Sequence, residues 1–217
     1  MIGWSATAVG ALLGTPQLLR LIRTRRLEGL SLFAWCSTMA VNISWLAHGL
    51  LIGQAPQVVT NVIALCSTVS ILVLLTRSLG RPLPLVLAVP VAVATLIIGI
   101  DVLLGSLAFG IVAVVPGMFS YVSQGVELVR SPKIRGLSPL FLTLAVLNQS
   151  LWLTWAWLVP DPGAIVACSL TLALTTFNLG WHTLRRLGMR AFFVRARDLA
   201  GAAATVAPAP TLALTRG

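Results

Sequence analysis

Charged residues are scarce in this chain of 217 residues. They make up 9% of it, whereas an ordinary soluble domain carries about a quarter. Five carboxylates, two histidines and one lysine are too few for most catalytic sites. The sequence contains no HExxH motif, P-loop, nucleophile elbow or pair of neighbouring carboxylates. We therefore expect that the chain is not an enzyme.

Cysteine is equally sparse. Cys36, Cys66 and Cys168 all lie inside apolar stretches, and there is no CxxC motif and no Cys/His cluster. This excludes a zinc site, a haem-attachment motif and a disulfide framework. Cys36 and Cys66 are best interpreted as small core residues. We expect neither a metal nor a cofactor.

Apolar residues, in contrast, are abundant. They form 58% of the chain, and the mean hydropathy is +0.97. A soluble domain of this size has too little interior to hide that much apolar surface, so the sequence predicts a protein embedded in a lipid bilayer. The formal charge of +10 is confined to short stretches between the apolar runs. This pattern favours an anionic membrane surface and excludes nucleic acid as the partner.

Seven apolar segments are long enough to cross a bilayer, which takes about 20 residues. They are residues 2–22, 31–52, 55–76, 83–103, 108–129, 137–159 and 162–184. With seven crossings, every arginine and the lysine fall on one side, and the other side holds Asp101 and Asp161. Because basic loops stay in the cytoplasm, we expect the N-terminus outside and the C-terminus inside. The bias to Arg, Ala and Leu is compatible with a GC-rich bacterium, so we place the chain in a bacterial inner membrane.

The sequence repeats itself at an offset of 107 residues. Gln17 aligns with Gln124, Arg23 with Arg130, Gly29-Leu30-Ser31 with Gly136-Leu137-Ser138, and Trp45 with Trp152. Each copy holds three spans and begins outside, so one extra crossing must return the chain between them. We therefore expect an all-α integral membrane fold with two parallel three-helix bundles joined by an inversion helix. The predicted units are 1–78, the linker helix 79–106, 107–186, and a basic, largely disordered cytoplasmic tail at 187–217.

Trp45 and Asn61 are the strongest candidates for a binding site. They flank a short outer turn that contains Gly53 and Pro56, and each lies about 8 residues, or roughly 12 Å, from that turn. Both therefore come near mid-membrane. An indole face and a carboxamide suit a neutral polyol, because sugar C–H faces stack on aromatic rings and hydroxyls need hydrogen-bond partners.

Other polar residues in the spans leave alternatives open. Pro16-Gln17 predicts a kink in the first span, which is either a hinge or a static bend. Asn42 and Asn148 share a helix face with the two tryptophans, where they either line a cavity or join helices.

Three titratable residues lie at the outer ends of spans. We interpret His48 as an interfacial structural histidine in preference to a pH sensor. Asp101 and Asp161 are likewise interpreted as interfacial residues and not as proton carriers. By this interpretation no titratable group lies at mid-membrane depth.

The ordered set of polar residues resembles the SWEET sugar transporters of the PQ-loop superfamily, as a full-length bacterial member, over roughly residues 1–186. The residues that carry the resemblance are Pro16, Gln17, Arg20, Arg23, Glu28, Gly29, Leu30, Ser31, Trp35, Asn42, Trp45, Gly49, Pro56 and Asn61. The resemblance implies two three-helix bundles with an inversion helix. It also implies facilitated movement of mono- or disaccharides without an ion or ATP.

The resemblance further implies which residues act. The substrate pocket would hold Trp45, Asn61, Trp152, Cys168, Val41 and Asn148. Hinge or gating roles would fall to Pro16, Gln17, Pro139 and Gln124. The chain departs from the family pattern where Cys168 replaces a second Asn, Ser123 replaces a Pro, and His48 and Trp155 replace an aromatic residue that is often Tyr.

Three functions compete. The leading one is facilitative, bidirectional transport of a mono- or disaccharide by alternating access. The second is a proton-coupled PQ-loop carrier of an amino acid or another small solute, which needs a titratable group at mid-membrane depth. The third, which Cys168 permits, is a membrane scaffold or regulator that does not transport. Two complete bundles suffice for one pathway, so a homo-oligomer is optional.

Overall fold

The fold consists of seven helices in a computed structural model that describes residues 1–24, 30–131 and 138–192, without the side chains at 14–22 and 24. The helices are α1 Ile2–Thr24, α2 Leu32–Leu51, α3 Ala55–Ser78, α4 Leu83–Leu104, α5 Ser106–Arg130, α6 Pro139–Leu158 and α7 Pro162–Arg186. Each predicted segment contains one helix, and every helix end lies within two residues of the predicted one. The predictions of an all-α fold and of seven helical segments are therefore confirmed.

Local sequence sets where several helices begin and end. Ser31 and Ser138 precede α2 and α6, and each hydroxyl oxygen accepts a hydrogen bond from a backbone N–H in the first turn. Such N-caps contribute about 1 kcal/mol relative to Ala. Gly105 alone joins α4 to α5, with φ 83°, a conformation that favours glycine. The chain therefore reverses at a single residue here.

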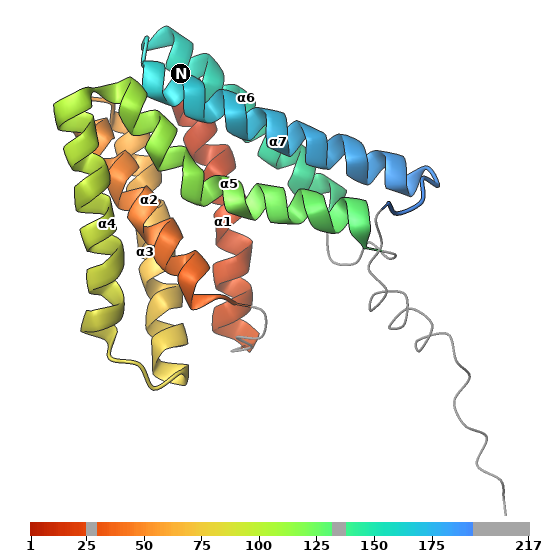
Figure 1. The fold of residues 1–217 in the computed structure, drawn as a ribbon, viewed down its shortest axis with the longest axis horizontal. Coiled ribbons are helices and arrows are strands. Elements are labelled where there is room, and N and C mark those ends of the chain that lie inside the picture. Colours follow the sequence, from red (N-terminus) through yellow and green to blue (C-terminus); the bar gives the residue numbers. More distant parts are fainter. Residues whose placement is uncertain (25–29, 132–137, 193–217) are drawn as a thin grey trace, which may run out of the picture.

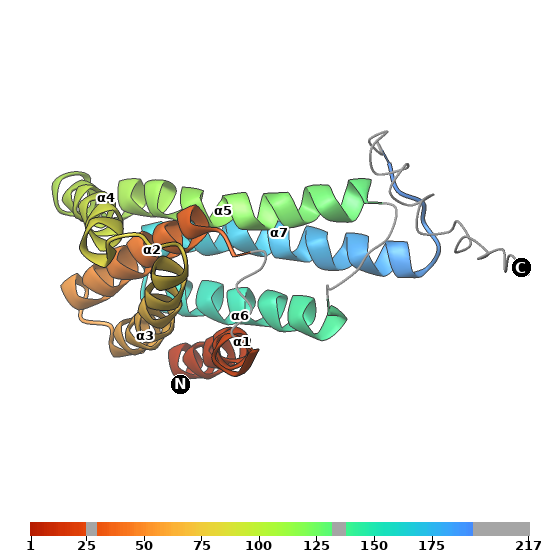
Figure 2. The same cartoon turned by 90° about the horizontal axis from the view of Figure 1, so that it is seen from below.

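The helices form two groups with the same internal order. α3 packs between α1 and α2, and α7 packs between α5 and α6. In the described part of the chain α1 does not contact α2, nor does α5 contact α6. α4 lies against α2, α3 and α5, and the two groups meet where α1 contacts α6 and α2 contacts α5 (Figures 1 and 2).

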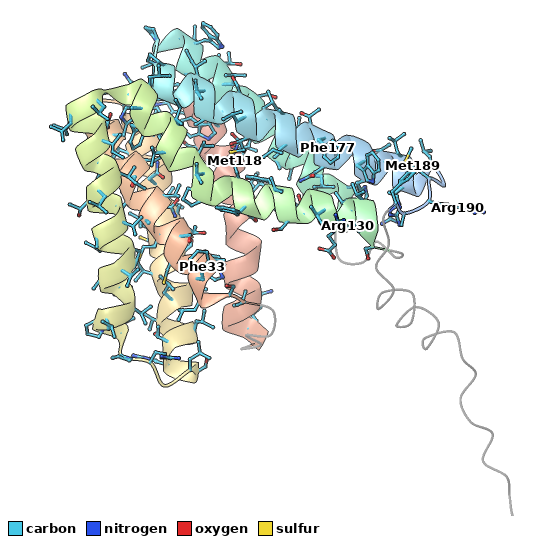
Figure 3. All side chains as sticks on the ribbon, viewed as in Figure 1. Phe33, Met118, Arg130, Phe177, Met189 and Arg190 are labelled. Carbon is cyan, nitrogen blue, oxygen red and sulfur yellow. The ribbon has the colours of Figure 1, made fainter. Side chains whose placement is uncertain are left out.

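The two ends of the molecule differ in charge. The turn end, toward the top of Figure 1, holds the turns at 52–54, Gly105 and 159–161, and here the two groups come together. At the basic end the groups diverge, and the last turns of α1, α3, α5 and α7 carry Arg23, Arg77, Arg130, Arg185 and Arg186. Figure 3 labels Arg130 and Arg190 there. No described arginine or lysine lies at the turn end.

Large apolar side chains cover much of the outer surface. Phe33 is 79% exposed and Phe177 is 46% exposed (Figure 3), and α4 presents a row of exposed Leu and Val residues. Soluble monomers rarely expose large contiguous apolar patches. Four helices, α3, α4, α5 and α7, are long and apolar enough to cross a membrane. These features indicate that the chain is integrated in a membrane.

Helices α2 and α6 are not among these four, and polar side chains interrupt both. Asn42 and His48 interrupt α2, while Asn148 and Gln149 interrupt α6. In α1 the apolar stretch among the described side chains is Ile2–Leu13. That these three helices also span the membrane stays a prediction.

The segment after α7 turns back toward α5. The backbone N–H of Phe192 donates to the carbonyl of Val129, and the rings of Phe192 and Trp181 lie 6.0 Å apart. Most of the predicted tail 187–217 lies outside the described residues.

Close contact between α5 and α7 gives a first prediction. A Cβ placed on Gly163 would overlap the backbone carbonyl of Ser106, and one on Gly110 would overlap Gly163. Neither backbone can move aside without shifting a helix, so Gly163→Ala should lower the free energy of unfolding by about 1–3 kcal/mol. The measurement is thermal unfolding of the purified protein in detergent. Gly99→Ala is the matched control, because its Cβ meets nothing within 4 Å; an equal effect of both substitutions would contradict the prediction.

Candidate functional site

A cavity of about 330 Å³ lies between the two helix groups, in the half of the molecule nearer the turn end. Five helices contribute to its wall. The lining residues are Val41, Asn42 and Trp45 of α2, Gln57, Thr60 and Asn61 of α3, Ala113, Val114, Gly117 and Tyr121 of α5, Asn148, Gln149, Trp152 and Trp155 of α6, and Ala164, Ala167, Cys168 and Thr171 of α7.

All six residues predicted to bind substrate lie in this wall. They are Trp45, Asn61, Trp152, Cys168, Val41 and Asn148. Helical spacing explains the clustering, because residues three and four apart share a face. The turn between α2 and α3 brings Asn61 beside Trp45, and the turn between α6 and α7 brings Cys168 beside Trp152. That these residues bind a solute stays a prediction.

Side-chain amides give the wall its polar character. Gln57 donates from Nε2 to the carbonyl of Trp45 over 3.1 Å, and Asn61 donates from Nδ2 to the carbonyl of Gln57 over 2.8 Å. Among the described residues, the side-chain oxygens of Gln57 and Asn148 have no hydrogen-bond partner. Both oxygens are inaccessible to solvent in this conformation. No lining residue is charged, so the wall suits a neutral solute.

Aromatic rings are held rigidly around the cavity. Trp152 and Trp155 meet edge to face with ring centres 5.2 Å apart. Trp45 meets Phe109 in the same way at 4.8 Å. Because each ring is fixed by its neighbour, the indole faces are pre-organised for stacking.

A second cavity of about 260 Å³ adjoins the first. It lies between α1, α2, α3 and α6, and both cavities are lined by Asn42, Thr60, Asn148 and Trp152. The second cavity includes Trp35 from the start of α2 and Ile71 from the second half of α3. It therefore extends from the first cavity toward the basic end.

Three titratable residues meet just beyond the first cavity, at the turn end. Nδ1 of His48 lies 2.6 Å from Oδ2 of Asp101, and Nε2 lies 3.0 Å from Oδ2 of Asp161. The hydroxyl of Ser106 donates to Oδ1 of Asp161. The His48 ring stacks on Phe109 at 4.5 Å, so Phe109 contacts both this cluster and the wall residue Trp45.

That these three residues lie at the outer membrane interface stays a prediction, but the structure shows that they are buried within the protein. His48 is 1% exposed, Asp101 8% and Asp161 4%. The physical reason is that α2 packs against α4 and α5, so the turn end closes over the histidine. The sequence could not show this, because the carboxylates lie 53 and 113 residues from His48.

Of the predicted hinge residues, Gln124 and Pro139 lie outside the cavity wall. Pro16 and Gln17 fall within α1, but their side chains lie outside the described part. Gln124 accepts a hydrogen bond from Asn178 at 2.9 Å and so joins α5 to α7. Pro139 is the first residue of α6, where proline removes no helical hydrogen bond.

Sequence reasoning missed a proline that does interrupt a helix at the cavity. Pro116 lies inside α5, next to the lining residue Gly117. Proline in a helix interior removes one backbone hydrogen bond and bends the helix. It also missed Gln57, Tyr121 and Gln149 in the wall. An aromatic or amide at helical spacing from a predicted site residue was the available signal, such as Gln149 three residues before Trp152 or Gln57 four residues before Asn61.

No family model, curated protein or solved structure matches this chain.

Proposed function

We propose that this chain moves a small neutral sugar, a mono- or disaccharide, across a bacterial inner membrane by alternating access. The observation that carries the proposal is the uncharged cavity between two helix groups, with indole rings and side-chain amides in its wall. The resemblance of the sequence to the SWEET transporters supports the same function. No coupling ion or ATP is required for facilitated movement in either direction.

The architecture in this proposal is two three-helix bundles joined by α4. The repeated order of neighbours, with the third helix of each group in the middle, supports it. So do the capping serines at equivalent positions of α2 and α6. All seven helices would span the bilayer, and the basic end would face the cytoplasm, with the N-terminus outside.

The size and chemistry of the cavity favour a monosaccharide over a larger sugar in this conformation. A volume of 330 Å³ is near the lower limit of small-molecule sites, about 300–1,000 Å³. Indole rings and side-chain amides in the wall are the groups that sugar C–H faces and hydroxyls contact.

Alternating access follows from the way the two groups meet. At the turn end they are joined by the hydrogen bond between His48 and Asp161, while at the basic end they diverge (Figure 1). The second cavity provides space between the binding site and the basic end. Rocking of one group against the other would separate the turn end and close the basic end around the same site.

The test is counterflow in proteoliposomes without a pH gradient. Purified protein is loaded with unlabelled sugars, and labelled glucose or sucrose is supplied outside. Trp152→Ala should reduce labelled glucose accumulation about tenfold, because losing an aromatic contact of about 1–1.5 kcal/mol weakens binding by roughly that factor. Trp157→Ala is the matched control, since Trp157 lies on the same helix but is 66% exposed on the outer surface.

The outcomes separate the candidate functions. Counterflow that is lost in Trp152→Ala and kept in Trp157→Ala supports a sugar carrier with its site in this cavity. Counterflow that both variants keep would place the site elsewhere. Uptake that requires an imposed pH gradient would favour a proton-coupled carrier. If well-folded protein transports no sugar either with or without the gradient, a scaffold would be favoured.

A further inference from the structure

His48 is held between two carboxylates by both nitrogens of its ring. The contacts of 2.6 and 3.0 Å are direct hydrogen bonds, and the ring is nearly inaccessible. Hydrogen-bond distances on both sides leave no room for an ion between the groups. The cluster of His48, Asp101, Asp161 and Ser106 is therefore closed and internally paired.

The geometry fixes how many protons the cluster holds. A neutral imidazole has one N–H and one lone pair, so it can satisfy only one of two ionised carboxylates. The other contact would then place a lone pair against a negative oxygen. Two good hydrogen bonds need two protons, which the doubly protonated ring supplies. The closed arrangement thus contains one more proton than a neutral histidine between two carboxylates.

No other described charge faces this histidine. Asp101 of α4 and Asp161, which caps α7, are the charged groups in contact with it. α5 contributes Ser106 and Phe109 to its surroundings, and Trp45 of α2 meets the ring edge to face. The Cys168 thiol lies two turns along α7 from Asp161. The Met1 amino group, at the start of α1, is fully exposed.

The cluster also crosses between the two helix groups. His48 and Asp101 belong to α2 and α4, whereas Asp161 caps α7 and Ser106 is the first residue of α5. Separation of the groups at the turn end must break the contact between His48 and Asp161. We propose that this cluster is a proton-binding site that keeps the turn end closed while the second proton is present, and releases that proton when the end opens.

The direction of the pH effect follows from the charges around His48 when the turn end is closed and when it is open. Opening removes one carboxylate from the imidazolium, and an opposite charge nearby favours the charged form. The closed state therefore holds the second proton to a higher pH than the open state does. Below the pH at which the open state loses the second proton, this proton fully favours the closed state. The preference for the closed state disappears as the pH rises through the value at which the closed state also loses the proton. Raising the external pH should open the turn end.

Cys168 provides a native reporter of opening that needs no substrate. It lines the cavity just inside the cluster, so an impermeant methanethiosulfonate applied outside intact cells reaches it when the turn end opens. The experiment uses the full chain with Cys36→Ser and Cys66→Ser, from about pH 6 to pH 8. The rate of Cys168 labelling is measured in this protein and in the same protein with His48→Gln. The ratio of the first rate to the second should rise by about tenfold per pH unit over the range in which the cluster titrates.

Two controls separate the proton effect from thiol chemistry and misfolding. The variant Ala55→Cys/Cys168→Ser carries an exposed thiol at the turn end. The pH dependence of its labelling rate should match that of Cys168 in the His48→Gln variant. Asp101→Asn keeps the shape of the cluster but removes one carboxylate, so the midpoint of the Cys168 profile should move to lower pH. A merely structural role for Asp101 would not move this midpoint.

The inference rests on the proposed alternating access, but the two can fail separately. Identical pH profiles with and without His48 would overturn the proton-binding site, even if sugar counterflow is present. A pH-dependent Cys168 profile that requires His48, without counterflow of any sugar, would support the site and overturn the sugar as substrate.

Discussion

Alkylation of Cys168 with N-ethylmaleimide is expected to abolish sugar counterflow almost completely. Cys168 lies in the cavity wall beside Ala164 and Thr171. A maleimide adduct would fill a large part of the 330 Å³, and a close-packed wall cannot widen to accommodate both adduct and sugar. The measurement is counterflow after quantitative modification, confirmed by intact-protein mass spectrometry. An excess of glucose during the reaction should slow the modification.

The other two cysteines allow matched controls. Cys66 is exposed on the outer surface of α3, and the Cys36 thiol lies 3.8 Å from the carbonyl of Val86; both are outside the cavity wall. Cys36→Ser with Cys66→Ser should remain sensitive to the reagent, whereas Cys168→Ser should become resistant. Normal counterflow by a chain that is fully modified at Cys168 would place the transport path elsewhere.

The helices were predictable because the physical constraint on them is local. A bilayer requires about 20 apolar residues in each span, and Gly, Pro and Ser at fixed points mark the ends. The capping roles of Ser31 and Ser138 follow from the same local rule. The single-residue turn at Gly105 was not predictable, because an apolar pattern continues on both sides of it.

The cavity was predictable in part. Trp45 and Asn61 are close in sequence and are joined by a short turn, so helix geometry alone places them at similar depth. The meeting of α2 with α4 and α5 and with the residue that caps α7 depends on packing between distant segments, so the pairing of His48 with Asp101 and Asp161 could not be read from spacing. For the same reason the inward direction of Tyr121 was missed.

Replacement of Asp161 by alanine should cause the largest loss of stability in this chain. The carboxylate accepts from His48, from the Ser106 hydroxyl and from the backbone N–H of Gly163. Removing one partner of a buried ion pair costs about 3–5 kcal/mol because the other charge is left uncompensated. Removing the N-cap of α7 adds about 1 kcal/mol. The expected decrease in Tm is roughly 8–24 °C for a protein of this size, measured by thermal unfolding in detergent.

Substitution of His48 tests whether the loss of stability in Asp161→Ala comes from the uncompensated charge of this histidine. Asp161→Asn keeps an oxygen for the N-cap and for Ser106, so it should lose less stability than Asp161→Ala. His48→Phe removes the charge and keeps an aromatic ring against Phe109. If the buried imidazolium causes the loss, the double variant Asp161→Ala/His48→Phe should be more stable than the sum of the single effects predicts, by about 0.5–3 kcal/mol. Strict additivity would instead show that the lost stability comes from the cap of α7 and its contact with Ser106, and not from the ion pair.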